Sequence, residues 1–136
     1  MFTVDATSGA LVAQPAFTED LNWSGGIHMR ADGSLVGVSW VASGGDDGVE
    51  ALFAMDPATA ETTLVAEIPG LRWVLASVNA YNPAADHIHI VGASDDAAGF
   101  RIYTIDAGSG ELVSDPVLDT PSAEHAYNWS GGLHLR

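Results

Sequence analysis

The chain has 136 residues, no cysteine and a formal net charge of −14, because 18 acidic residues oppose four arginines. The lack of cysteine excludes disulfides and thiolate metal sites, and no apolar run is long enough to span a membrane. The negative charge argues against nucleic acid and anionic membranes as partners, since both need basic patches, and it suits a cationic partner, a divalent ion or solubility in salt.

In chain order, the sequence repeats one unit with a period of about 50 residues. The segment FTVDATSGALVA at 2–13 returns as YTIDAGSGELVS at 103–114, and NWSGGIHMR at 22–30 returns as NWSGGLHLR at 128–136. A weaker copy, LFAMDPATAETTLVA, lies between them. Such a period indicates one supersecondary unit used several times. We therefore expect one repeat domain over 1–136, made of a partial unit 1–21, full units 22–71 and 72–126, and a partial unit 127–136.

Each full unit is predicted to form four short strands, because runs of Val, Ile and Leu alternate with Gly, Pro, Asn and Asp. In the first unit the predicted strands are 25–30, 35–40, 51–56 and 62–68, with an acidic loop over 43–50. In the second unit they are 72–81, 87–94, 100–106 and 111–118. Since no window has an apolar period of about 3.6 residues, the predicted fold class is all-β with almost no helix.

Three aspartates mark the repeat. Asp5, Asp56 and Asp106 each end a predicted strand just before a turn, in the same sequence context. An aspartate at such a position accepts hydrogen bonds from backbone amides of the following turn. We expect these residues to cap hairpins and to have no role in ligand binding.

The segments LFAMDPATAETTLVAEIPG, GGIHMRADGSLVGVSW and IYTIDAGSGELV resemble the blade repeats of bacterial β-propeller proteins. The resemblance covers nearly the whole chain, and it rests on turns and strand faces. It implies β-propeller blades of four antiparallel strands and carries over no catalytic residue. The middle unit departs from the pattern, with WVLAS where the outer units have WSGGI or WSGGL.

The phase of the units predicts that the chain is incomplete by itself. It begins on a third strand and ends just after a first strand, whereas propeller rings contain about four or more blades. An open blade edge would also template pairing with other chains. We expect either a homo-oligomeric ring of two or three copies or a piece of a longer propeller. The alternative fold is a β-trefoil, which requires three equal repeats.

The repeated NWSGG segment is the first candidate binding site. Indole faces stack on sugars or cations and asparagine amides bind hydroxyl groups, so the segment suits a carbohydrate ligand. The structural alternative is that the tryptophans pack between blades. The candidate residues are Asn22, Trp23, Asn128 and Trp129, with Trp73 expected at the same place in the middle unit.

Histidines give two further candidates. His28 and His134 each precede an arginine by two residues, so His28 with Arg30, and His134 with Arg136, share a strand face. They would line a central channel and bind an anion or a metal, or would be hydrogen-bonded to a neighbouring blade. A further pair, His87 and His89, has H-x-H spacing but lacks further ligands for zinc.

Paired aspartates form a weak candidate for Ca²⁺. Asp46 and Asp47, and Asp95 and Asp96, fall in equivalent loops beside glycine, where carboxylates and backbone carbonyls together suit Ca²⁺. Neither loop has the spacing of a calcium-binding loop, so solvated loop acids are the alternative and no cofactor is otherwise expected.

The function favoured by the sequence is a non-catalytic scaffold or binding module that recognises a glycan or a protein. No nucleophile–base arrangement or nucleotide fingerprint is present. Two alternatives stay open: a fragment of a propeller enzyme, such as a hydrolase, lyase or quinoprotein with a channel metal, and an engineered or evolutionary fragment with no native ligand. The compartment is undetermined, with a preference for a secreted location, although the N-terminus lacks the pattern of a signal peptide.

Overall fold

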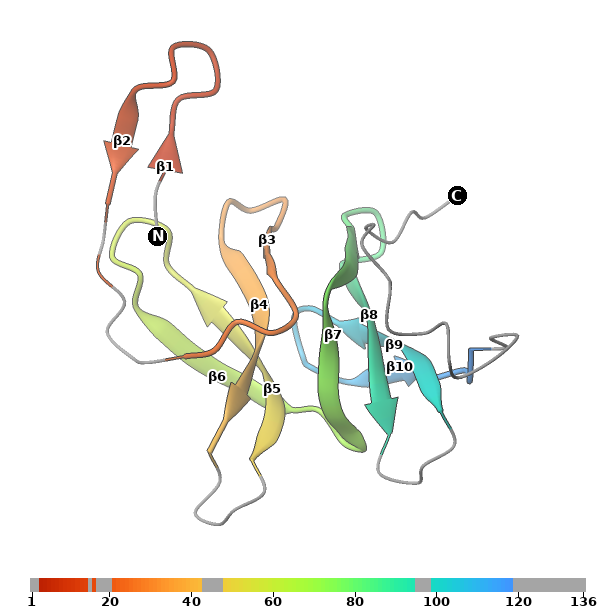
Figure 1. Cartoon of the computed structure of the whole chain (residues 1–136). Helices are drawn as coiled ribbons and strands as arrows, with labels where there is room; N and C mark the ends of the chain where they lie inside the picture. The colour runs from red at the N-terminus through yellow and green to blue at the C-terminus, as the bar shows by residue number, and fades with distance from the viewer. Residues whose placement is uncertain (1–2, 15, 17–20, 43–47, 95–98, 119–136) are drawn as a thin grey trace.

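The computed structural model describes residues 3–14, 16, 21–42, 48–94 and 99–118 (Figure 1). All regular structure in these ranges is β, which confirms the predicted all-β class. The strands are β1 (Thr3–Val4), β2 (Leu11–Ala13), β3 (Ile27–Met29), β4 (Leu35–Val41), β5 (Val49–Met55), β6 (Thr62–Glu67), β7 (Leu71–Asn82), β8 (His87–Ser94), β9 (Phe100–Asp106) and β10 (Leu112–Ser114).

The strands form two four-stranded antiparallel sheets and one two-stranded hairpin. The first sheet has the order β3-β4-β5-β6, the second has the order β10-β9-β8-β7, and β1 pairs with β2. Each strand therefore pairs with its neighbour in sequence, as expected where short turns join consecutive strands. Figure 1 shows the two sheets side by side, with the hairpin projecting away from them.

One hydrophobic core lies between the two sheets. Because side chains alternate between the faces of a strand, one face of each sheet is apolar toward the other. The buried cluster takes Val36, Val38, Leu52 and Ile68 from the first sheet and its exit, and Leu71, Val74, Ile88, Ile90, Tyr103, Ile105 and Ala107 from the second sheet and its turn. A smaller cluster, of Leu35, Met55 and Ala60, lies on the opposite face of the first sheet.

The predicted aspartate caps are confirmed in all three copies. Asp5 Oδ1 accepts the amide of Ser8 at 2.7 Å, Asp56 Oδ1 accepts the amide of Ala58 at 2.7 Å, and Asp106 Oδ1 accepts an amide at 2.7 Å from Ser109. The last turn residue is left-handed in each copy, with φ of 72° at Gly9, 59° at Ala60 and 76° at Gly110. The repeat in sequence is thus a repeat in local structure.

One predicted boundary is wrong. The acidic loop predicted over 43–50 ends earlier, because Val49 and Glu50 belong to β5 and Glu50 is buried. The carboxyl is hydrogen-bonded to Ser24 and Val74, which lie far from it in sequence, so the local sequence does not indicate its burial.

We predict that Gly110→Ala destabilises the fold more than Gly70→Ala does. Both glycines have left-handed φ, 76° and 73°, so alanine costs roughly 1 kcal/mol at either site. At Gly110 the new methyl would also overlap the Cβ of Ala66 on β6, where the second sheet's last turn packs on the first sheet. Overpacking of this kind adds about 1–3 kcal/mol.

Urea unfolding of the two variants and the parent measures this difference. Gly70 is the matched control, since nothing lies within 4 Å of an added methyl there. Equal losses of unfolding free energy in the two variants would show that the turn does not pack against β6 as described.

Candidate functional site

The sheet junction near the β3–β4 turn holds an ion-pair cluster. Arg30 follows β3 and donates two hydrogen bonds to Asp86, from Nε to Oδ1 at 3.1 Å and from Nη2 to Oδ2. The hydroxyl of Tyr81 on β7 donates to the same carboxylate at 2.7 Å. Asp86 therefore joins a residue of the first sheet to a residue of the second, across 56 positions of sequence.

The main chain holds Asp86 in a constrained position. Its φ is 54°, a left-handed conformation that aspartate tolerates better than most residues. Its carbonyl accepts the amide of Ala107 at 2.8 Å. The guanidinium bond and the hydroxyl bond together hold the pKa of Asp86 below its ordinary value, despite partial burial. The same pairing raises the pKa of Arg30.

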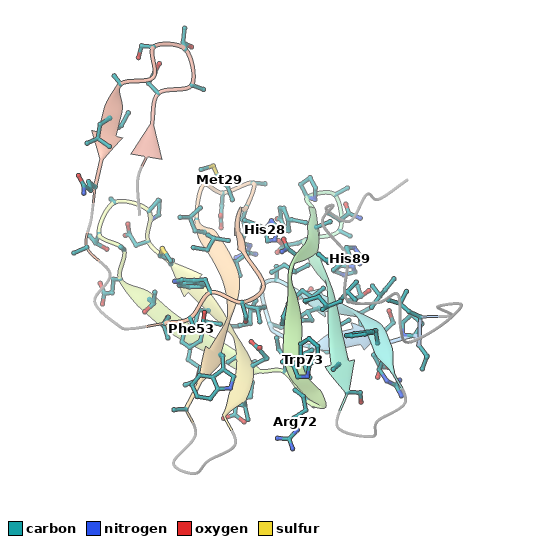
Figure 2. All side chains as sticks on the ribbon, in the orientation of Figure 1. His28, Met29, Phe53, Arg72, Trp73 and His89 are labelled. Carbon is teal, nitrogen blue, oxygen red and sulfur yellow. The ribbon has the colours of Figure 1, made fainter. Side chains whose placement is uncertain are left out.

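His28 lies beside this cluster and faces the second sheet, as Figure 2 shows. Its ring stacks on Tyr81 with centroids 6.0 Å apart and an interplanar angle of 25°. It is hydrogen-bonded to the side chain of Asn79 on β7, and burial nevertheless holds its pKa below the ordinary 6.5. The expectation that His28 and Arg30 share a strand face is confirmed, since both contact the second sheet.

Trp23 is packed within the first sheet. Its ring meets Phe53 edge-on, with centroids 6.2 Å apart at 74°. A methyl group on Gly37 would lie 2.9 Å from the indole, so this glycine is what lets the ring lie flat against the sheet. Trp23 also packs against the cluster of Leu35 and Met55. The geometry favours the structural alternative for this tryptophan, because its ring faces protein.

Trp73 does not occupy the position of Trp23, and the predicted equivalence is wrong. Trp73 pairs with Ala93, which lies opposite Phe100. The matching row of the first sheet is Asn22, Trp40 and Glu50. Phe100 and Glu50 each lie six residues before the capping aspartate of their unit, so these two positions are equivalent. Trp73 therefore corresponds to Asn22, the residue at the other end of the matching row. The shared residue type suggests that Trp73 matches Trp23. The two units differ in length between these paired positions, however, so the two tryptophans lie at different places.

Trp40 is a candidate that sequence reasoning missed. It is 39% exposed, and Trp73 is 43% exposed, whereas Trp23 is only partly accessible. Trp40 continues the alternating side-chain pattern of β4. That pattern predicts a strand, but it does not indicate that the Trp40 side chain is exposed. Its place opposite the exposed Asn22 appears only once the register is known.

The remaining candidates are placed as follows. His87 and His89 lie close together, with ring centroids 6.4 Å apart, and His89 Nδ1 is 3.1 Å from Thr104 Oγ1. Within the described ranges no three or more His, Cys, Asp or Glu side chains gather as metal ligands. The candidates outside the described residues are Asp46, Asp47, Asp95, Asp96, Asn128, Trp129, His134 and Arg136.

Comparisons with known proteins add no relative, since no family model, curated protein or solved structure matches the chain. Among the described residues there is no helix with the length and apolar character of a membrane span.

We predict a coupling free energy of about 1 kcal/mol between Arg30 and Asp86, a value reduced by partial exposure of both side chains. A double-mutant cycle with Arg30→Gln and Asp86→Asn, followed by urea unfolding, measures it. Asparagine is chosen because it also tolerates the left-handed φ at position 86. The pair Arg101 and Asp115, 3.2 Å apart within the second sheet, is the control and should couple more weakly. Additive effects of the Arg30 and Asp86 changes would contradict the bridge.

We also predict that His28 makes the protein less stable in mild acid. A lowered folded-state pKa means that His28 contributes stability above pH 6.5, where the unfolded chain is also neutral, and that this stability is lost as the pH falls through the folded-state pKa. His28→Gln removes the titrating group. The variant should therefore lose less unfolding free energy than the parent when the pH falls from above 6.5 to about one unit below it. Equal losses would show that His28 is solvated in the folded state.

Proposed function

We propose that the chain is a non-catalytic scaffold or binding module of the β-propeller type, completed by further copies of itself. The support is its two consecutive four-stranded sheets, which have the same strand succession and meet face to face through one core. Successive sheets stacked in this way are the repeating element of a propeller. A β-trefoil is the less suitable fold, because it requires three equal repeats and the units of this chain are unequal.

The observation that carries the proposal is the hairpin β1–β2. It has the same register and the same irregularity as β9–β10, since Val4 pairs with Leu11 as Ile105 pairs with Leu112. In the complete unit β9 also pairs with β8, whereas β1 pairs only with β2 among the described strands. The hairpin therefore has the pairing of the second half of a unit, and no described strand pairs with β1 as β8 pairs with β9. A two-stranded hairpin is marginally stable alone.

Burial of one pair of equivalent residues supports the same proposal. Leu112 packs against the core between the sheets, but its counterpart Leu11 is 56% exposed. A strand of a second copy that pairs with β1, as β8 pairs with β9, would remove the open edge and cover Leu11.

Both outer faces of the sheet pair also present apolar side chains. Met29 is 64% exposed and Leu64 is 54% exposed on the first sheet, on the face opposite the second sheet. In the first sheet, the row of Asn22, Trp40 and Glu50 faces the second sheet. Trp73 lies in the corresponding row of the second sheet, on the face where a further sheet would follow. Neighbouring sheets from other copies would cover these faces, and a head-to-tail contact that closes gives a cyclic oligomer.

We predict that the chain forms a discrete oligomer of two or three times 14.1 kDa and that the double variant Leu11→Lys, Val12→Lys is monomeric. Both residues lie on β2, and the charge of a lysine at position 11 would have to be buried where the second copy is proposed to cover Leu11. Light scattering coupled to size exclusion measures the mass, and circular dichroism checks that the sheets persist.

The control is Val113→Lys, which alters the position equivalent to Val12 in a unit that is already complete and where the valine is 51% exposed. This variant should assemble like the parent. A parent protein that is monomeric at every concentration, or a double variant that assembles normally, would refute completion through the hairpin.

A further inference from the structure

A hollow of about 520 Å³ lies beside the β4–β5 end of the first sheet, lined by Leu21, Asn22, Trp40, Val41 and Ala42. Its volume falls in the range of small-molecule sites, which are mostly apolar with a few placed polar groups. Here the polar side chain is the exposed amide of Asn22, and the large apolar surface is the indole of Trp40. None of these described lining residues carries a charge.

The backbone and a glycine hold Trp40 in place. Its amide donates to the carbonyl of Asn22 at 3.1 Å, which fixes the two residues opposite each other. The six-membered part of the indole lies against Gly48, where any side chain would overlap it. Trp40 is 39% exposed under these constraints, so part of its surface is accessible to a ligand.

The buried carboxyl of Glu50 connects the segments around Trp40. Glu50 is 1% exposed and lies opposite Trp40 on β5. It accepts the hydroxyl of Ser24 at 2.5 Å and a backbone hydrogen bond from Val74 of the second sheet. Burial raises the pKa of Glu50, and these two bonds oppose the rise. Glu50 on β5 thus connects Ser24, which follows Asn22, with Val74 of the second sheet.

We propose that this hollow binds an uncharged pyranose sugar ring, with one C–H face on the indole of Trp40 and a hydroxyl edge on the amide of Asn22. The indole offers a flat apolar surface, and the amide both donates and accepts, which matches the two characters of a sugar ring. The net charge of −14 disfavours anionic ligands. The site deepens the proposed role as a binding module and does not require the oligomer.

The test uses the full chain and a panel of methyl pyranosides of glucose, galactose, mannose and N-acetylglucosamine, followed by indole N–H resonances in NMR titrations. At least one sugar should shift the Trp40 resonance in a saturable way. Trp40→Ala should lower affinity about tenfold or more, and Asn22→Ala about fivefold. Trp73→Ala is the matched control, because Trp73 is exposed to a similar extent but is not among the residues that line the hollow, and the variant should bind like the parent.

Trp40→Phe is the control for loss of folding in Trp40→Ala. It keeps an aromatic face and should therefore retain part of the affinity. No saturable shift for any sugar, or equal affinity in the Trp40→Ala and parent proteins, would overturn the proposal. Light scattering on the same samples separates the two hypotheses. A monomer that binds sugar leaves this site standing and refutes the ring, whereas an oligomer that binds none refutes only the site.

Discussion

The apolar contact between the two sheets is the constraint on which the rest of the structure depends. Its cluster draws buried side chains from both sheets, so neither sheet has a complete core of its own. Burial of apolar area is the main stabilising term in such a fold, but it has no direction and would tolerate sliding. Polar bonds that cross the contact therefore matter more for the relative position of the sheets than for their adhesion.

Polar connections cross the contact near both ends of β7. Near the β7–β8 turn, Arg30 and Tyr81 converge on Asp86. Near the start of β7, Glu50 receives the backbone bond of Val74. A buried carboxyl with two donors is costly to leave unpaired, so it selects one arrangement of the sheets even where its net stabilisation is small. The apolar core and the polar ends thus have separate roles, adhesion and register.

Local patterns predicted the strands well and the site poorly. The bounds of β8 and β9 agree with the predicted 87–94 and 100–106, because alternation and turn residues are properties of consecutive positions. The Arg30–Asp86 pair joins residues 56 positions apart, and nothing in the sequence near Asp86 indicates its partner. The packing of Trp23 likewise depends on Gly37 of β4, where a methyl group would overlap the indole. Such contacts depend on strand register and on how two sheets meet, which local patterns do not encode.

The two exposed tryptophans differ in what their exposure means. Trp73 and Phe100 meet edge-on, 5.7 Å apart, on a face of the second sheet that would meet another sheet in the proposed ring. Their exposure is what an uncovered interface predicts. Trp40 lies in the corresponding row of the first sheet, where the neighbouring sheet is already present and Glu50 is buried. Since Trp40 is 39% exposed with the second sheet in place, its accessible surface is not accounted for by a missing neighbour. For that reason we assign Trp73 to assembly and Trp40 to a ligand.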